Sequence, residues 1–177
     1  MKKVELIGNT KVIKDEYFIN YNTLTQNQRL AENETNDCVV KSFMVAFGIN
    51  YDTSHKWVMK YFKRNTRRGT YTRLYLDSVL GKIKNGYKLK LKGYSPSHDF
   101  SFRDYPKTRL LTNPKYKKPT SYTVSSFLEN HPIGRFIVIV DAHAYAVVNG
   151  VMYGNEDERY KSLARRVCYV LEVVKTP

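Results

Sequence analysis

The chain has 177 residues, 42% of them hydrophobic, and carries a formal net charge of +14 from 30 Lys and Arg against 16 Asp and Glu. This length and composition favour one compact domain and exclude wholesale disorder. No apolar run approaches the roughly 20 residues that span a bilayer, and the N-terminus turns polar too soon for a secretory signal. We therefore expect a cytoplasmic protein with no membrane partner.

Two cysteines, Cys38 and Cys168, are too few for a disulfide framework. The four histidines show no close pairing with either cysteine along the chain, so neither a metal nor another cofactor is expected. The surplus of positive charge favours a polyanionic partner, either nucleic acid or an acidic protein.

The N-terminal part predicts short strands followed by a buried helix. Residues 1–24 alternate weakly and are typical of one or two strands, and the polar residues 25–37 predict a loop. From Cys38 to Phe47 apolar residues recur with a helical period, and Gly48 is a natural end. Three residues could cap the start of this helix: Thr35, Asn36 and Asp37.

Two further helices and a strand are predicted next. The first helix covers about 53–64 after Asp52 or Thr53 as cap, and it places His55 on its polar face. A weaker helix covers about 72–83. Residues 87–92 alternate lysine with apolar residues, which predicts a strand with one lysine-covered face.

The C-terminal part predicts an antiparallel sheet. Residues 94–121 show little periodicity, and we interpret them as a long connection that could form a flap over a site. A short helix at about 124–130 leads to the apolar strand 136–140. Three more strands are predicted: 143–148, 151–153 after a turn at Asn149-Gly150, and 167–174. Helices followed by an antiparallel sheet indicate the α+β class.

Cys38 and His143 are the residues best placed for chemistry. At a helix start, the dipole and the free N–H groups favour a thiolate at Cys38 and can bind a developing oxyanion. His143 opens a strand and shares one face with Tyr145 and Val147, which suits an imidazole general base. Cys168 alternates with apolar residues in its strand and is expected in the core.

A third group should orient the imidazole. After the hairpin, polar residues return beside the start of the strand that carries His143, so Asn155 or Asp157 could reach the ring. The runs 64–68, 88–92 and 115–118 are strongly basic and are read either as solvated surface or as polyanion contacts.

The combination of these two local patterns resembles papain-like cysteine peptidases, especially small phage-encoded members and double-glycine leader peptidases. Asn36-Asp37-Cys38 opens a hydrophobic helix, and His143-Ala-Tyr-Ala-Val-Val-Asn-Gly150 forms the later hairpin. The likeness covers residues 36–62 and 123–157. It implies a papain-like α+β fold, Cys38 as nucleophile, His143 as base and Asn155 as the orienting residue, with Asp157 as the alternative. A phage-encoded member would act in the cytoplasm of the host cell.

The oxyanion donor is less closely matched to that family. Leader peptidases carry a Gln about six residues before the nucleophile, where this chain has Glu32. We therefore expect the backbone N–H of Cys38 and the side chain of Asn36 to bind the oxyanion. Three other carboxamides are alternatives: Asn33, Gln26 and Gln28.

The expected architecture is a single papain-like domain over residues 1–177. Its expected parts are the N-terminal strands and loop (1–35), the helical part (36–84), a strand and long loop (85–122) and the sheet part (123–177). The predicted function is a cysteine peptidase that cleaves a peptide or isopeptide bond in a protein or peptide substrate through an acyl-enzyme. Side-chain amide hydrolysis and acyl transfer share that intermediate. The alternative is a catalytically weak or inactive papain-like basic module that binds nucleic acid or an acidic host protein.

Overall fold

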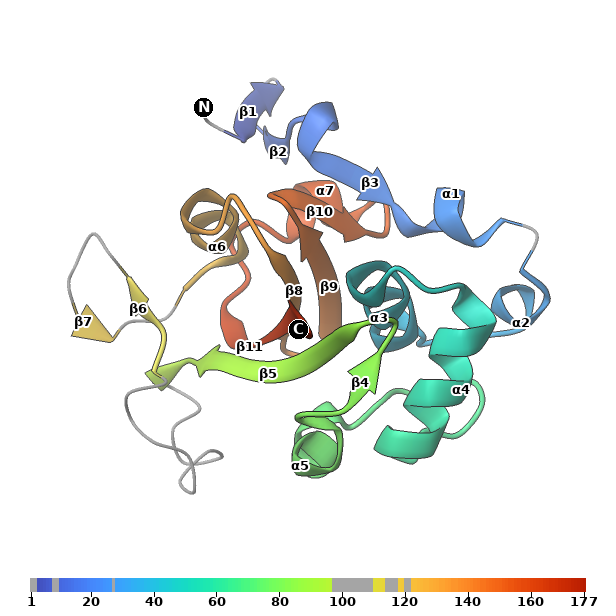
Figure 1. Ribbon diagram of the computed structural model, residues 1–177. Coiled ribbons are helices and arrows are strands. Elements are labelled where there is room, and N and C mark those ends of the chain that lie inside the picture. Colours follow the sequence, from blue (N-terminus) through green and yellow to red (C-terminus); the bar gives the residue numbers. More distant parts are fainter. Residues whose placement is uncertain (1–2, 8–9, 27, 97–109, 114–117, 120–121) are drawn as a thin grey trace.

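A computed structural model of the chain describes residues 3–7, 10–26, 28–96, 110–113, 118–119 and 122–177 (Figure 1). The strands are β1 (Val4–Ile7), β2 (Thr10–Ile13), β3 (Phe18–Asn20), β4 (Ile83–Lys84), β5 (Tyr87–Tyr94), β6 (Thr112–Asn113), β7 (Lys118–Pro119), β8 (Arg135–Val140), β9 (His143–Val148), β10 (Val151–Gly154) and β11 (Val167–Lys175). The helices are η1 (Asp15–Tyr17), α1 (Tyr21–Thr25), α2 (Arg29–Glu32), α3 (Cys38–Phe47), α4 (Tyr51–Phe62), η2 (Thr72–Tyr75), α5 (Leu76–Val79), α6 (Val124–Asn130) and α7 (Glu158–Lys161).

A seven-stranded sheet forms the centre of the molecule, with the strand order β3-β10-β9-β8-β11-β5-β4. Every neighbouring pair is antiparallel except β3 with β10, which is parallel. The α+β class is therefore confirmed. The prediction that helices come first and the sheet afterwards is only partly right, because β3 and the β4–β5 hairpin belong to this same sheet.

Helices cover both faces of the sheet, and each face has its own hydrophobic core. In Figure 1, α3 and α4 lie on one side of the strands and α6 lies on the other. Alternate residues of β8 serve the two cores: Ile137 and Ile139 pack with α3 and α4, whereas Phe136 and Val138 pack with α6. This double burial explains why residues 136–140 are continuously apolar rather than alternating.

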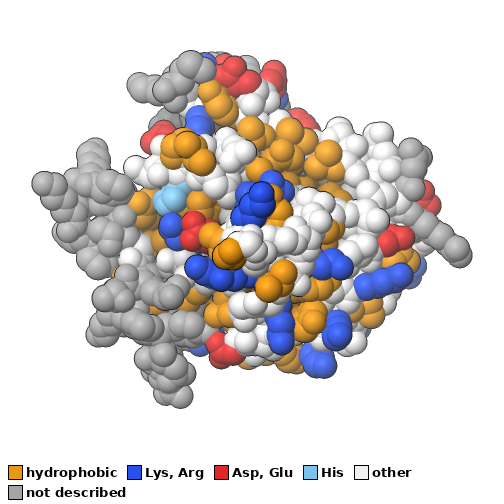
Figure 2. All heavy atoms as spheres, viewed as in Figure 1, with side chains coloured by type: hydrophobic (Ala, Val, Ile, Leu, Met, Phe, Trp, Pro, Cys, Tyr) orange, Lys and Arg blue, Asp and Glu red, His pale blue; other side chains and the backbone are white. Residues whose placement is uncertain are grey.

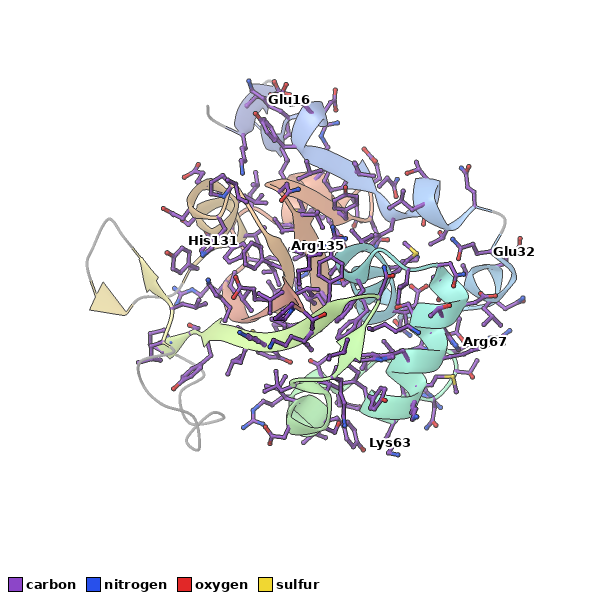
Figure 3. All side chains as sticks on the ribbon, in the orientation of Figure 1. Glu16, Glu32, Lys63, Arg67, His131 and Arg135 are labelled. Atoms are coloured by element: carbon purple, nitrogen blue, oxygen red, sulfur yellow. The ribbon has the colours of Figure 1, made fainter. Side chains whose placement is uncertain are left out.

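The helix α3 is held at its C-terminal end by side chains from other elements. Gly48 takes the left-handed conformation that ends the helix, with φ of 63°. Arg135 donates to the carbonyl oxygens of Ala46 (2.6 Å) and Val45 (2.8 Å). Figure 3 shows Arg135 between the sheet and α3. Arg135 thus supplies a donor to the Ala46 carbonyl and a second donor to the Val45 carbonyl, which also accepts from the Gly48 N–H at 3.2 Å, and it fixes α3 against β8.

Several predicted boundaries need correction. The second helix begins at Tyr51, and its cap is Asn50, whose side chain accepts from the Thr53 N–H at 2.8 Å, rather than Asp52 or Thr53. The predicted helix 72–83 is instead η2 followed by α5, and its last residue, Ile83, begins β4. The loop 25–37 contains the short helix α2.

The segment 94–121 is described only in part. Its residues 97–109, 114–117 and 120–121 lie outside the described residues, and so does the expected flap. The described residues of this segment include the short strands β6 and β7, which pair antiparallel. Within the part of the chain that the structure describes, no helix has both the length and the hydropathy that crossing a membrane requires.

Candidate active site

Cys38 is the first residue of α3, and its side chain is half-buried. The residue before it, Asp37, occupies the N-cap position but makes no side-chain capping bond to the helix. Its carboxylate instead accepts from the Tyr51 hydroxyl at 2.6 Å and pairs with Lys41 at 3.2 Å. The free N–H groups of the first helical turn are therefore not taken by Asp37 and can face a developing oxyanion beside the thiol.

His143 begins β9 and lies mostly buried, with its side chain 14% exposed. Its ring packs edge-to-face on Tyr145, with 4.6 Å between the ring centroids. The Nε2 atom lies 2.5 Å from Oε1 of Glu158. That approach is an ion pair and falls outside hydrogen-bond geometry. The ring is thus held on one side by a carboxylate that the sequence prediction did not include.

Glu158 is buried and held in place by Asn155. The Asn155 backbone N–H donates to Oε2 of Glu158 at 2.7 Å, and the Asn155 side-chain amide donates to Oε1 at 3.1 Å. Gly154 makes this position available, because a Cβ on that residue would overlap Oε2. Glu158 is therefore a fixed carboxylate beside the imidazole, and its orientation depends on Gly154 and Asn155.

The surroundings of His143 favour its charged form. Burial alone would disfavour the imidazolium, but the interactions of the ring with Cys38 and Glu158 outweigh it and raise the pKa of His143 to about 9. Of the interactions that raise this pKa, the one with Cys38 is the largest, so the thiol and the ring lie close together. At neutral pH the imidazole therefore carries a proton next to the thiol.

A chain of hydrogen bonds connects the helix of Cys38 to the strand of His143. The backbone N–H of Ala146 in β9 donates to the Tyr21 hydroxyl at 2.9 Å. The Tyr21 hydroxyl lies 2.8 Å from Oγ of Ser42, which in turn donates to the Cys38 carbonyl at 2.7 Å. Because Ser42 uses its proton on Cys38, Tyr21 donates to Ser42. All four groups lie in the interior, and they set the separation of α3 and β9.

Cys38 and His143 line one cavity of about 850 Å³. Its walls come from the start of α3, from the segment 69–74, and from the end of β8 with the turn into β9. Tyr71 and Leu74 in the second wall are 75% and 74% exposed, so they present apolar surface next to the thiol. Cys168 and Tyr169 complete the wall from β11. The cavity is large enough to admit several residues of an extended peptide.

The structure brings most of the predicted site residues to this cavity. Asn36 lines it from the loop before α3, with φ of 54°, and Asn155 lines it as well. The Asn155 side chain, however, contacts Glu158 and not the ring. Asp157 is exposed and pairs with Lys161 at 3.5 Å, on the surface. Cys168 packs in the core and also borders the cavity.

Glu158 could have been found from a local signal. Asn155 and Glu158 are three residues apart at the start of α7, and the glutamate reaches back to the Asn155 N–H as in a capping box. The pattern marks a helix start, and that start places the carboxylate beside the preceding strand. It does not by itself reveal that the strand neighbour is His143, because that contact depends on how α7 folds back onto β9.

The side chains considered as oxyanion donors differ in whether they line the cavity. The described cavity lining contains two carboxamide side chains, Asn36 and Asn155. Gln28 accepts from the Tyr51 backbone N–H at 2.6 Å and donates to the Leu24 carbonyl, so both its side-chain groups are used elsewhere. Glu32 is exposed at the end of α2, where Figure 3 labels it at the margin of the molecule. Its carboxylate therefore does not border the described cavity.

No group of three or more metal-binding side chains gathers among the described residues. Comparison of the chain with family models, with curated proteins and with solved structures finds no match in any of the three.

Proposed function

We propose that this protein is a cysteine peptidase with a papain-like arrangement of its site, in which Cys38 and His143 act on a peptide or isopeptide bond. The observation that carries the proposal is that Cys38 and His143, from distant parts of the chain, line one cavity, while the Glu158 carboxylate contacts the imidazole. A thiol at a helix start, a protonated imidazole and a buried carboxylate form the set that thiolate catalysis needs.

In the first half of the reaction, the Cys38 thiolate attacks the carbonyl carbon of the substrate. The carbonyl electrons move to its oxygen, and the Cys38 backbone N–H and Asn36 stabilise the resulting oxyanion. When the oxyanion collapses, the bond to nitrogen breaks, and His143 gives its proton to the leaving amine. The product of this half is a thioester between Cys38 and the acyl part of the substrate.

In the second half, neutral His143 removes a proton from water, and the resulting hydroxide attacks the thioester. Collapse of the second oxyanion releases the carboxylic acid and restores the Cys38 thiolate beside a protonated His143. Glu158 keeps the ring oriented and stabilises its positive charge in both halves, the role first assigned to Asn155. Asn155 supports Glu158 through its two hydrogen bonds.

Selective alkylation tests the activated thiolate, and the chain supplies its own control. Burial raises the pKa of the Cys168 thiol to about 11, so that thiol stays protonated at pH 6. We expect iodoacetamide at pH 6 to modify Cys38 and to spare Cys168, as read by peptide mass mapping. The His143→Ala variant should lose this selectivity, because the imidazolium that stabilises the thiolate is gone.

Turnover is tested with a peptide library and a panel of isopeptide-linked substrates. Cleavage should disappear in Cys38→Ala and persist in Cys168→Ser, and a thioester adduct on Cys38 should appear by intact mass. Equal inertness of both cysteines to alkylation, together with cleavage unaffected by Cys38→Ala, would refute the proposed chemistry.

A further inference from the structure

Strand β5 carries a row of lysines on one side. Leu89 and Leu91 point into the core, with 0% and 3% exposure. Lys88, Lys90 and Lys92 alternate with them and therefore point the opposite way, at intervals of about 7 Å along the strand. Lys90 and Lys92 are exposed, and Lys88 is half-exposed. We call these three side chains the lysine face.

The lysine face lies beyond the part of the sheet that α6 covers. Lys90 pairs with Glu172 of β11, and Glu172 pairs with Phe136 of β8 in the next ladder. Directly paired residues share a face, so the lysines lie on the side where Phe136 packs against α6. The core on that side includes β8 and β9 and does not include the lysines. The outer strand thus presents a flat surface on which ammonium groups replace apolar side chains.

Almost no acidic group balances this charge. The stretch from Gly81 to Gly93 contains five lysines and no Asp or Glu. Across β4, β5 and β11, the one acidic residue is Glu172, and it lies 3.2 Å from Lys92. Figure 2 shows Lys and Arg side chains gathered over the β5 region, with few acidic side chains among them.

We infer that the lysine face binds the phosphate backbone of nucleic acid, independently of the sequence of the bases. Regularly spaced ammonium groups on long stems match a row of phosphates, and each phosphate contact releases counterions. The strand turns no exposed aromatic or Arg side chain to this side, whereas protein–protein interfaces are enriched in aromatics and Arg and depleted in Lys. This composition disfavours an acidic protein as the occupant. The inference does not depend on the proposed peptidase activity.

The test measures binding of a fluorescein-labelled 20-nucleotide DNA single strand, and of its duplex, from 50 to 300 mM NaCl. We expect log Kd to rise linearly with log salt. The triple variant Lys88→Ala/Lys90→Ala/Lys92→Ala should bind the single strand at least ten-fold more weakly at 100 mM NaCl. Its salt slope should be smaller by about 2, since each phosphate contact on a single strand contributes about 0.7.

A matched triple variant removes the same charge from another surface. Lys56, Lys60 and Arg68 are exposed on α4 and the turn after it. Replacing these three by Ala should change the affinity less than three-fold and leave the salt slope unchanged. Circular dichroism checks that both triple variants fold. If the Lys88/Lys90/Lys92 variant does not fold, the single variant Lys90→Glu is used in its place.

Three results would overturn the inference. Equal weakening by the two triple variants would mean that net charge alone attracts the DNA. If the DNA does not bind at 50 mM NaCl, the lysines do not contact phosphates. Their role would then be to prevent another chain from pairing with the edge of the sheet. Tighter binding to poly-glutamate, or to vesicles with anionic lipid, than to DNA at the same salt concentration would assign the face to another partner.

Discussion

His143 and Glu158 form the contact on which the proposed chemistry most depends. The carboxylate lies 2.5 Å from Nε2, is buried, and is oriented by two hydrogen bonds from Asn155. A carboxylate in this position supports the imidazolium more strongly than a neutral carboxamide, because it adds a full opposite charge. The His143 side chain therefore carries its proton over the neutral range, with a pKa of about 9.

Replacing Glu158 by Gln should lower that pKa while it preserves the shape of the site. Loss of the negative charge should move the pKa of His143 down by about 1 to 2. The alkaline limb of kcat/KM should shift to lower pH by the same amount, and kcat should fall by about ten-fold because the ring is less firmly oriented. NMR titration of the His143 ring measures the pKa directly.

The matched control for this variant is Asp157→Asn, which removes an exposed acidic residue one position away. It should leave both the titration and the pH profile unchanged. If Glu158→Gln also leaves them unchanged, the carboxylate does not act on His143.

Two elements, α3 and β9, must keep a fixed separation for the site to exist. The buried hydroxyl of Tyr21 lies between them and is bonded both to the Ala146 N–H and to Ser42. Desolvation raises the pKa of this hydroxyl far above its ordinary range, so it stays a neutral donor at any pH where the protein works.

The Tyr21→Phe variant removes only the hydroxyl. It leaves the Ala146 N–H buried without its partner, which should lower the free energy of unfolding by about 1–3 kcal/mol in urea titrations. Since α3 and β9 then lose a shared tether, kcat should fall while KM changes little. Tyr61→Phe on α4 is the control and should affect neither quantity. An unchanged kcat in Tyr21→Phe would restrict the hydroxyl to a role in stability.

The loop before α3 depends on a buried ion pair. Glu34 binds Arg64 at 2.6 Å, also contacts His55 at 3.0 Å, and accepts from the Arg67 N–H at 2.9 Å. Burial opposes the Glu34 charge, but these contacts outweigh it and hold the pKa of Glu34 below its usual value. They join the loop that carries Asn36 to the segment that leads to the opposite cavity wall.

Replacing Glu34 by Gln should be severe because it leaves the Arg64 charge buried without a counter-ion. The expected loss in the free energy of unfolding is about 3–5 kcal/mol. Glu32→Gln is the control, since Glu32 is exposed two residues away, and it should change the stability by less than about 0.5 kcal/mol. Similar stability of the two variants would show that the pair is not needed to order this loop.

At the scale of the whole molecule, stability should depend on pH through the same groups. The pKa of His143 is raised by folding, so its contribution is fully present below about 6.5 and is lost as the pH rises through about 9. The pKa of Glu34 is lowered by folding, so its contribution is present above its unfolded value and is lost on acidification.

The measurement is the free energy of unfolding from pH 4 to 10 for the native sequence and for His143→Gln. The difference between the two proteins should shrink between about pH 6.5 and 9, where the unfolded and folded forms of His143 titrate. A difference that stays constant over this range would mean that His143 is not charged in the folded protein.

Much of this architecture follows from local patterns, and the rest depends on contacts between distant residues. The helix from Cys38 to Phe47, the hairpin after His143 and the helix α6 were predictable, because period, turn residues and caps are encoded within a few positions. The parallel pairing of β3 with β10 was not predictable, since nothing near Phe18 specifies a partner strand so far along the chain. His55 was expected on the polar face of its helix, but it is buried, and its Nε2 lies 3.0 Å from Oε1 of Glu34.

The candidate site follows the same division. Cys38 and His143 stand in local contexts that single out their chemistry, and both reach the cavity. The local sequence does not single out their third partner, because Asn155, Asp157 and Glu158 are equally polar. Only the course of α7 decides which carboxylate meets the imidazole.

The parallel pair of β3 and β10 has a consequence for the time at which the candidate site is completed. The strand at residues 18–20 is made early in synthesis and has no sheet partner until β10 has been made. Glu158 follows β10 closely, so the N-terminal strand and the imidazole pair are completed almost together. A nascent chain would therefore expose Cys38 long before it could form a working site. Under the proposed peptidase function, this order of synthesis would keep the nascent chain from cleaving neighbouring proteins during translation.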